Sequence, residues 1–215
     1  VPDAWLIPLE GDAANNRIQV FSPDGKVLKT IPLERPNLIC IHKKTGALYV
    51  LHAARVEGRS VSRVTKRKSY AEPREEFHAD GLDGLMTLDS WTAQPRLWFG
   101  GRMGKRAGHG ESIATSYTGA GSVTLWEERG KKFEKIADFA AEAEKEAGKS
   151  WCGRWNGVPM HILGFANATC DPNTEKMYFR YNDVFNLVTG AREGRFQPLG
   201  GCFQDISFDR HGYLH

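Results

Sequence analysis

The sequence predicts an all-β protein built from repeated four-stranded antiparallel units. One pattern occurs four times: an apolar residue followed by Asp or His, a polar turn of three to seven residues, then Leu or Met followed by an aromatic residue or His. The repeated positions Leu48, Leu97, Met177 and Leu214 lie 49, 80 and 37 residues apart. Four-stranded units of roughly 40 to 50 residues are typical of propeller blades, so we expect a β-propeller with about four to five blades' worth of sequence in this chain.

The first predicted element is the hairpin in the stretch NNRIQVFSPDGKVLKTIP, residues 15–32. Two short strands, 17–22 and 26–31, flank Pro23-Asp24-Gly25, whose residue types favour a tight turn. In the repeats that follow, we expect a strand, a turn whose Asp hydrogen-bonds its own backbone, and a second strand with one apolar side. The turn position is occupied by His42, Asp89, Asp171 and Asp209.

Each of the first three copies is followed by a further predicted pair of strands, at 60–70, 121–139 and 183–196. These pairs complete the four-stranded units. The basic run RVTKRK at 63–68 is balanced by EPREE at 72–76, so we interpret it as a solvated strand edge and turn rather than an anion-binding patch.

The long 80-residue interval contains two predicted insertions. One is the Gly-rich loop 100–121. The other begins at Asp138, which suits a helix N-cap, continues with Ala, Glu and Lys, and reaches Gly148, a common stop; it predicts a short helix at 139–147. Loops inserted between strands often carry the specificity of such proteins.

The stretch 15–54 resembles an NHL repeat. It contains Asn-Arg-Ile-Gln-Val-Phe, an Asp-Gly turn, a strand led by Pro36, and Gly-Ala-Leu-Tyr-Val. The remaining copies are similar more loosely, since His42 replaces the usual Asp and the turn at 89–96 is longer. The resemblance implies a β-propeller, typically of about six blades. NHL proteins include interaction modules as well as lyases and lactonase-like enzymes, so it implies the fold and leaves the activity open.

The chain is expected to form a single NHL-like propeller domain over 1–215 that is incomplete at both ends. It begins with Val1 and stops at His215 inside a predicted strand, and it holds fewer blades than a full ring. Another chain, or further sequence, would then complete the ring. The sequence begins without Met, which suggests that a leader has been removed before Val1, and proteins with such folds often lie outside the cytoplasm. Together these points favour an extracytoplasmic location, either secreted or periplasmic.

The composition excludes some classes of function. The formal net charge of +3 and the absence of a clustered basic face argue against a nucleic-acid partner. No run approaches the roughly 20 apolar residues of a membrane span. The four cysteines form no C-x-x-C pair. We interpret Cys40 and Cys170 as small buried thiols in strands, whereas a bridge between Cys152 and Cys202 is left open.

The segment WCGRWNGVPMHILGF contains the candidate ligand-binding residues Trp151, Arg154, Trp155, Asn156 and His161. It lies in a connection that leads into a strand, where a loop can face a ligand. The alternative is that the two tryptophans pack the inserted helix onto the sheets. The packing role is the favoured interpretation of the two tryptophans.

A metal site is the second candidate. Weak candidates for its ligands are the equivalent turn positions His42, Asp89, Asp171 and Asp209, which separate blades could bring together around a central channel. A turn-capping role is the favoured interpretation of these residues. No cofactor is assigned, and a divalent ion, calcium or zinc, belongs only to the enzyme alternative.

The sequence favours a non-catalytic binding or scaffolding module that takes a protein or small-molecule ligand on loops 100–121 and 150–162. The first alternative is a metal-dependent lactonase-like or peptidyl-α-hydroxyglycine lyase-like enzyme with its site at the central channel. The second is a propeller domain of a larger multidomain enzyme. Whether the protein is an enzyme is therefore left open.

Overall fold

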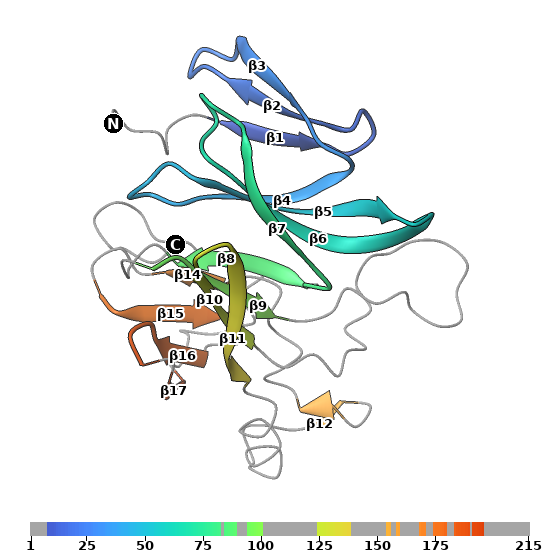
Figure 1. Ribbon diagram of the computed structural model, residues 1–215. Helices are drawn as coiled ribbons and strands as arrows, with labels where there is room; N and C mark the ends of the chain where they lie inside the picture. The colour runs from blue at the N-terminus through green and yellow to red at the C-terminus, as the bar shows by residue number, and fades with distance from the viewer. Residues whose placement is uncertain are drawn as a thin grey trace. The chain divides into compact units, whose positions relative to one another are not determined.

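The computed structural model describes residues 8–82, 84–89, 94–100, 124–138, 154–155, 158–159, 168–170, 174–179, 183–189 and 191–195. Every regular element in these ranges is a β-strand, and the paired strands run antiparallel, which confirms the predicted all-β class (Figure 1). The chain divides into two compact units. Unit 1 comprises 1–83 and 128–134, and unit 2 comprises 84–127 and 135–215.

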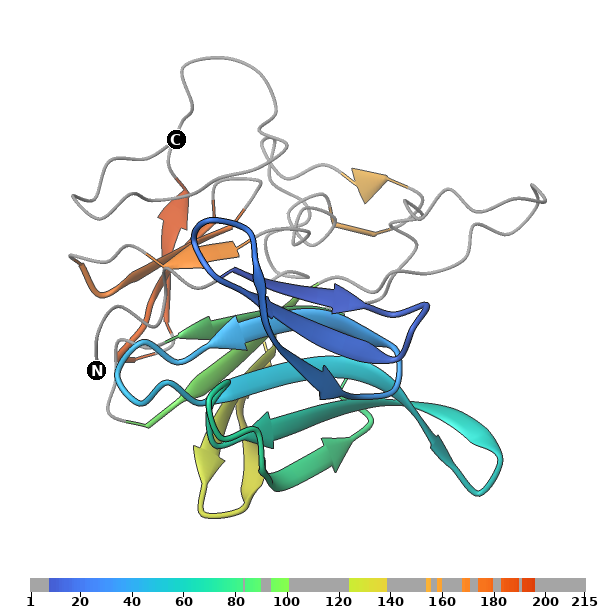
Figure 2. The same cartoon turned by 90° about the horizontal axis from the view of Figure 1, so that it is seen from above.

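Unit 1 contains two sheets of consecutive strands. The first has three strands in the order β1 (Leu9–Asp12), β2 (Arg17–Phe21) and β3 (Val27–Pro32). The second has four strands in the order β4 (Pro36–Ile41), β5 (Leu48–Val56), β6 (Arg59–Arg67) and β7 (Glu75–Asp80). Figure 2 shows β1–β3 in blue and β4–β7 in lighter blue to green.

The opening hairpin lies within one residue of its predicted bounds. Its turn is closed by Ser22, whose backbone N–H donates to Lys26 O at 2.8 Å and whose hydroxyl accepts from Lys26 N at 3.0 Å. Gly25 has φ +84°, a conformation that glycine adopts without the steric cost of a side chain. Asp24-Gly25 is therefore a turn, as the sequence predicts.

The core of unit 1 is made by apolar residues that alternate along these strands. Its buried members come from β2, β3 and β5 and the connection after β3: Ile18, Val20, Ile31, Leu33, Leu48 and Val50. Residues 48 to 52 of β5 are all buried, on both faces of the strand. Strand β5 is thus the central element on which the rest of the unit packs.

The segment 60–70 is not a strand pair, contrary to the sequence prediction. Residues 60–67 lie in one long strand, β6, whose next partner β7 comes from the charged segment EEFHAD. Phe77 is the buried residue of β7. The interpretation of RVTKRK as a solvated edge is also wrong for Lys66, because β6 is an inner strand and the Lys66 side chain is only 15% exposed.

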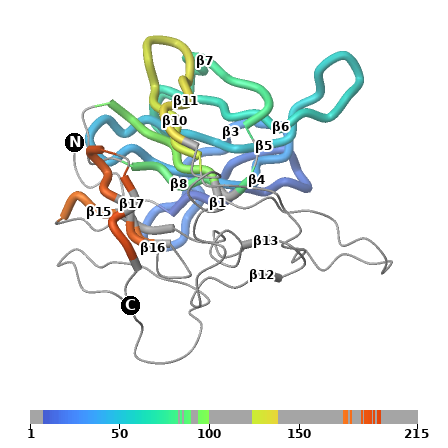
Figure 3. Tube along the Cα trace, turned by 90° about the horizontal axis from the view of Figure 1, so that it is seen from below, coloured from blue at the N-terminus to red at the C-terminus, as the bar shows by residue number. Residues whose placement is uncertain are grey.

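The β5–β6 hairpin extends past the neighbouring strands of its sheet. Pairing between β4 and β5 stops at Pro36 and His52, whereas β5 and β6 stay paired as far as Val56 and Arg59. Figure 3 shows this hairpin in turquoise, reaching beyond the sheet. The projecting part forms one wall of the pocket described below.

Unit 2 contains two four-stranded sheets and a small hairpin. The first sheet has the order β11-β10-β9-β8, with β8 (Leu85–Asp89), β9 (Arg96–Gly100), β10 (Thr124–Arg129) and β11 (Lys132–Asp138). The second has the order β14 (Ala168–Cys170), β15 (Lys176–Phe179), β16 (Asp183–Asn186) and β17 (Arg192–Arg195). The hairpin joins β12 (Arg154–Trp155) to β13 (Val158–Pro159).

The hairpin tip 128–134, which consists of the end of β10, the turn and the start of β11, belongs to unit 1 by its contacts. Three sheets of four consecutive antiparallel strands agree with the predicted four-stranded unit. The predicted helix at 139–147 and the loop 101–121 lie outside the described residues. In the described part of the chain, no helix has the length and apolar character that a membrane span needs.

Candidate functional site

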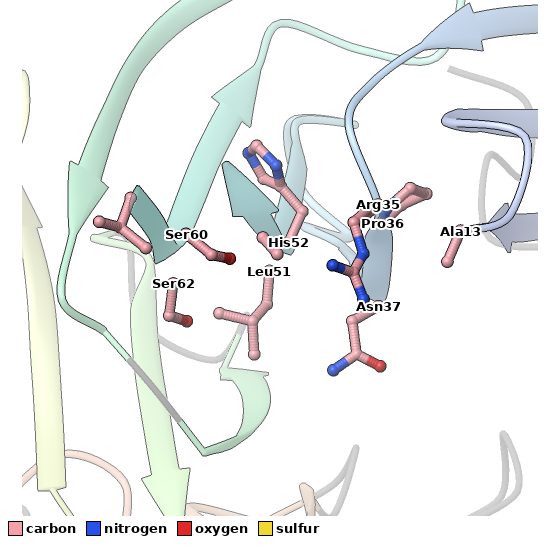
Figure 4. Close-up of a pocket in the computed structure, with 10 residues that line it drawn as sticks. Ala13, Arg35, Pro36, Asn37, Leu51, His52, Ser60 and Ser62 are labelled. Carbon is pink, nitrogen blue, oxygen red and sulfur yellow. The ribbon is translucent and has the colours of Figure 1, made fainter. Parts of the chain in front are cut away.

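A pocket of about 410 Å³ opens in unit 1 beside the projecting β5–β6 hairpin (Figure 4). Its polar lining consists of Arg35, Asn37, His52, Ser60 and Ser62. Its apolar lining consists of Ala13, Pro36, Leu51, Ala53 and Val61. Pockets of roughly 300 to 1,000 Å³ with apolar walls and a few polar groups are the usual form of small-ligand sites.

The pocket exists because β5 continues for several residues past the position where its partner β4 begins. Beyond His52, no residue of β4 stands beside β5. The register also shifts between Pro36 and Leu38, so Asn37 is an extra residue in the ladder, which is a β-bulge. Bulges redirect side chains, and here the bulge lies at the pocket edge.

Arg35 is held in an unusual backbone conformation at the pocket rim. Its φ is +41°, in the left-handed region that costs a residue with a side chain about 1–2 kcal/mol. Arg35 N donates to the Asn16 side-chain oxygen at 3.0 Å, and Arg35 O accepts from Ala53 N at 3.4 Å. These contacts fix the conformation from both sides.

Two other side-chain-bearing residues among those described share this backbone region, Asn16 at φ +54° and Glu57 at φ +49°. Both lie in hairpin turns, where such values are ordinary. Arg35 instead lies in the connection between β3 and β4, in two different sheets. Strain of this kind is concentrated at functional sites, which draws attention to Arg35.

His52 is a structural member of the lining. Its Nδ1 lies 2.9 Å from Glu34 O and its Nε2 lies 2.8 Å from Thr65 Oγ1. Burial lowers the pKa of His52, which favours the neutral ring. A neutral ring suits both contacts, because Nδ1–H then donates to the carbonyl while Nε2 accepts from the hydroxyl. The ring joins the 34–36 segment to β6.

Three polar groups of the lining make no hydrogen bond to the described part of the chain. They are the guanidinium of Arg35, the side-chain amide of Asn37 and the hydroxyl of Ser60, all on exposed residues. Ser62 differs, because its hydroxyl donates to Leu82 O at 2.6 Å. The pocket thus combines a fixed frame with three groups that can bind a ligand.

A second polar cluster of unit 1 lies around the hairpin tip 128–134. Tyr49 OH donates to Glu128 Oε2 at 2.5 Å, and Lys66 Nζ lies 2.7 Å from Glu128 Oε1 and 3.1 Å from Glu76 Oε2. The ammonium of Lys66 also lies 5.7 Å from the ring centroid of Phe77. We call Tyr49, Lys66, Glu76 and Glu128 the buried ion cluster.

The protonation states of Tyr49 and Lys66 follow from burial and from the carboxyl groups beside them. Burial, and then the hydrogen bond to Glu128, raise the pKa of Tyr49 far above its ordinary value, so the phenol stays neutral. Burial lowers the pKa of Lys66, but the hydrogen bond and charge of Glu128, with those of Glu76, outweigh it and raise the pKa overall. The cluster therefore holds one cation between two carboxylates and acts as a tie within unit 1.

His42 lies at the start of the turn between β4 and β5, and its ring contacts the side chain of Thr45 within that turn. The ring Nδ1 of His42 lies 2.8 Å from Thr45 Oγ1. The backbone N–H of His42 donates to Ala47 O at 2.8 Å, and its backbone carbonyl accepts from Gly46 N at 2.8 Å. The ring is fully buried, and Nε2 has no hydrogen-bond partner in the described part of the chain. Burial lowers the pKa of His42 and favours the neutral ring.

The other predicted metal ligands are not brought together by the described residues. Asp89 ends β8 in unit 2, where it pairs with Arg96 across the ladder. Asp171 and Asp209 lie outside the described residues. Zinc sites need three or more protein ligands, and no group of three His, Cys, Asp or Glu side chains suited to a metal occurs within the described ranges. The metal site stays a prediction.

The predicted ligand-binding residues are only partly placed. Arg154 and Trp155 form β12, where their backbones pair with Pro159 and Val158. Trp151, Asn156 and His161 lie outside the described residues, as do Cys152 and Cys202. Cys40 lies in strand β4, as expected, but it is half-buried rather than buried. This candidate site also stays a prediction.

The pocket of unit 1 was missed by the sequence analysis. A signal existed in Arg35-Pro36-Asn37, which places a cation and an amide directly before an apolar strand. Ser60 and Ser62 give a second signal, since alternate residues of a strand share a face. Neither signal reveals that β5 and β6 extend past β4, because that difference arises from pairing between strands.

Comparison with models of known protein families gave no match to this chain. A comparison with curated proteins likewise gave no significant match. The resemblance to NHL repeats therefore stays a prediction.

Proposed function

We propose that this chain is part of an NHL-like β-propeller that acts as a non-catalytic binding module outside the cytoplasm. The consecutive four-stranded antiparallel sheets support the blade assignment, since each has the strand order of a propeller blade. The pocket of unit 1 is one ligand site of this module, in addition to the loops 100–121 and 150–162 expected from the sequence. A further segment or a second chain completes the ring.

The observation that carries the proposal is that some polar residues of the pocket are hydrogen-bonded to the protein while others are not. His52 and Ser62 are engaged by the protein and hold the walls, whereas Arg35, Asn37 and Ser60 present polar groups to the hollow. Fixed walls lower the entropy that binding costs, and uncommitted polar groups supply orientation. Such an arrangement binds and positions a ligand by hydrogen bonds and charge.

The test is a ligand screen on the whole chain with a variant that fills the pocket. We expect Ser60→Phe to abolish binding of a hit found by ligand-observed NMR, because the ring occupies the hollow. Arg59→Phe is the matched control, because it adds the same ring at a neighbouring position of β6 that is not part of the pocket lining. Hits that bind equally well to both variants would remove the pocket from the proposal.

The metal-dependent lactonase-like or lyase-like enzyme is kept as the second candidate because of His42. Its buried Nε2, without a partner in the described part of the chain, is a nitrogen that a divalent ion could use at the repeated turn position. Elemental analysis of the purified chain, with His42→Ala as control, separates the two candidates. One equivalent of zinc or calcium that is lost in the variant favours the enzyme; metal content unaffected by the substitution speaks against it.

A further inference from the structure

We infer that the pocket of unit 1 recognises a carboxylate attached to a small apolar body, with Arg35 as the residue that binds the anion. Free organic acids and the C-terminal residue of a peptide share this chemistry. The inference rests on the proposed function, namely that this pocket binds a ligand, and it adds the class of that ligand.

The charge of the lining favours an anion. Arg35 is its cation, His52 is neutral, and none of the ten lining residues is acidic. The neighbouring Glu34 carboxylate is directed elsewhere: one oxygen accepts from Arg55 N at 3.1 Å and the other lies 4.0 Å from the Arg55 guanidinium. Arg55 stands opposite Ser60 in the ladder, so this pair of opposite charges lies near the rim and leaves Arg35 as the cation of the lining.

The uncommitted groups match the geometry of a carboxylate. A guanidinium offers a planar fork of donors that pairs with both oxygens of a carboxylate, and such charge-assisted bonds are about twice as strong as neutral ones. Asn37 and Ser60 supply further donors on either side of the hollow (Figure 4). A carboxylate has about four acceptor positions, which is enough to accept hydrogen bonds from more than one of these groups.

The pocket is larger than an inorganic anion needs, and part of its wall is apolar. Its volume is about 410 Å³, and Pro36, Leu51 and Val61 form apolar walls. A ligand that fills it carries a hydrocarbon portion next to its charged end. This feature favours an organic acid over an inorganic anion.

The backbone of Arg35 supports its assignment as the anchor. Asn16 and Ala53 hold it at φ +41°, a conformation that glycine would adopt at lower cost. An arginine retained there gives up stability, as residues that serve a function often do. The constraint also fixes the start of the side chain, which reduces the entropy lost when a ligand binds.

The experiment is a titration of the whole chain with paired probes. N-acetyl-glycine, N-acetyl-leucine and N-acetyl-phenylalanine carry the carboxylate, and their primary amides are the neutral partners; inorganic phosphate is a separate arm. We expect an acid to bind at least about tenfold more tightly than its amide, as one charge-assisted interaction provides. Arg35→Gln should remove this difference without weakening the amide.

Arg59→Gln is the matched control, because it removes the same charge at a position of strand β6 that is not part of the pocket lining. It should leave both affinities unchanged, and circular dichroism should show that both variants fold. An acid and an amide of equal affinity in the parent chain would overturn the carboxylate inference while leaving the pocket as a binding site. Phosphate bound more tightly than any acid, in an Arg35-dependent way, would overturn it too. No binding of any probe or screen hit would overturn the proposed function as well.

Discussion

Lys66 and Arg35 illustrate opposite uses of a basic residue. Lys66 lies within the buried ion cluster and forms ion pairs with both Glu76 and Glu128, so its charge stabilises the fold. Arg35 is exposed, has a strained backbone and makes no side-chain hydrogen bond to the described part of the chain. The sequence shows both as ordinary surface cations. Their difference depends on which strands surround them, and a single sequence does not reveal this.

Arg35→Gly should stabilise the protein. Glycine relieves a left-handed strain of about 1–2 kcal/mol and adds chain entropy to the unfolded state, leaving a net gain of about 0.5–1 kcal/mol. Urea unfolding measures the gain. Arg55→Gly is the control, since it lies within the regular strand β5 and should lose about 0.5–1 kcal/mol. A loss at both positions would mean that Arg35 contributes packing or charge that outweighs its strain.

Lys66→Ala should destabilise the protein strongly. Removing the cation leaves Glu76 and Glu128 facing each other without it, and breaking a largely buried ion pair costs about 3–5 kcal/mol. The control is Lys68→Ala, whose partner Glu72 is an exposed residue and whose loss should cost less than about 1 kcal/mol. Denaturant unfolding measures both values. Similar small losses would show that the cluster is solvated in solution.

At the scale of the element, the sequence predicts strands well where apolar residues alternate and poorly where charges dominate. Strands β2, β3, β4, β5, β10 and β11 lie close to their predicted positions. Strand β7 was missed because its sequence, EEFHAD, has only one large apolar residue. Phe77 identifies the strand only once its partner β6 is known, so tertiary pairing, not local propensity, forms it.

Phe77 should also hold the hairpin tip 128–134 in place. Its ring centroid lies 5.1 Å from that of Phe133, which in turn lies 6.1 Å from Tyr49. Phe77→Ala should cost about 3–5 kcal/mol, the usual loss for a buried aromatic ring. Native-state hydrogen exchange should then show the amides of the tip opening more easily.

Val27→Ala is the comparison for Phe77→Ala. Val27 is 52% exposed at the end of strand β3, and its truncation should change stability by less than about 0.5 kcal/mol. Equal effects of the two substitutions on exchange at 128–134 would contradict the anchoring role of Phe77.

At the scale of the whole molecule, the fold class and the four-stranded order could be predicted from the sequence, but the site could not. The repeated Asp or His position and the Leu and Met spacing predict four-stranded antiparallel units, and three sheets have that order. The closed ring, the inserted helix and a single domain over 1–215 stay predictions. The pocket depends on how many residues β5 and β6 extend past the start of β4. That length is set by the pairing register of the strands rather than by residue type.

The stability of the whole molecule should fall as the pH is lowered below about 6.5. Burial lowers the pKa of both His42 and His52 in the folded state, so the unfolded chain binds protons first. Their contribution is complete above the unfolded value of 6.5 and is lost as the pH falls through it towards the folded values. Urea midpoints between pH 7.5 and 5 measure the slope.

The variant His52→Gln should flatten this slope, because glutamine keeps a donor and an acceptor but does not titrate. His78→Gln is the control: His78 lies at the surface beside Glu75, and the variant leaves both buried histidines in place. Identical slopes in the parent and in His52→Gln would assign the acid sensitivity to other groups.

The overhang of the β5–β6 hairpin also makes it a place for protein engineering. Its turn, Glu57-Gly58, is exposed, and the last rungs of its ladder involve no third strand. Extra rungs could lengthen the hairpin without altering the pairing of β4, and the added arm would deepen the wall of the pocket. Grafted sequences at this turn would face whatever occupies the hollow, so a library built there is a direct route to altered selectivity.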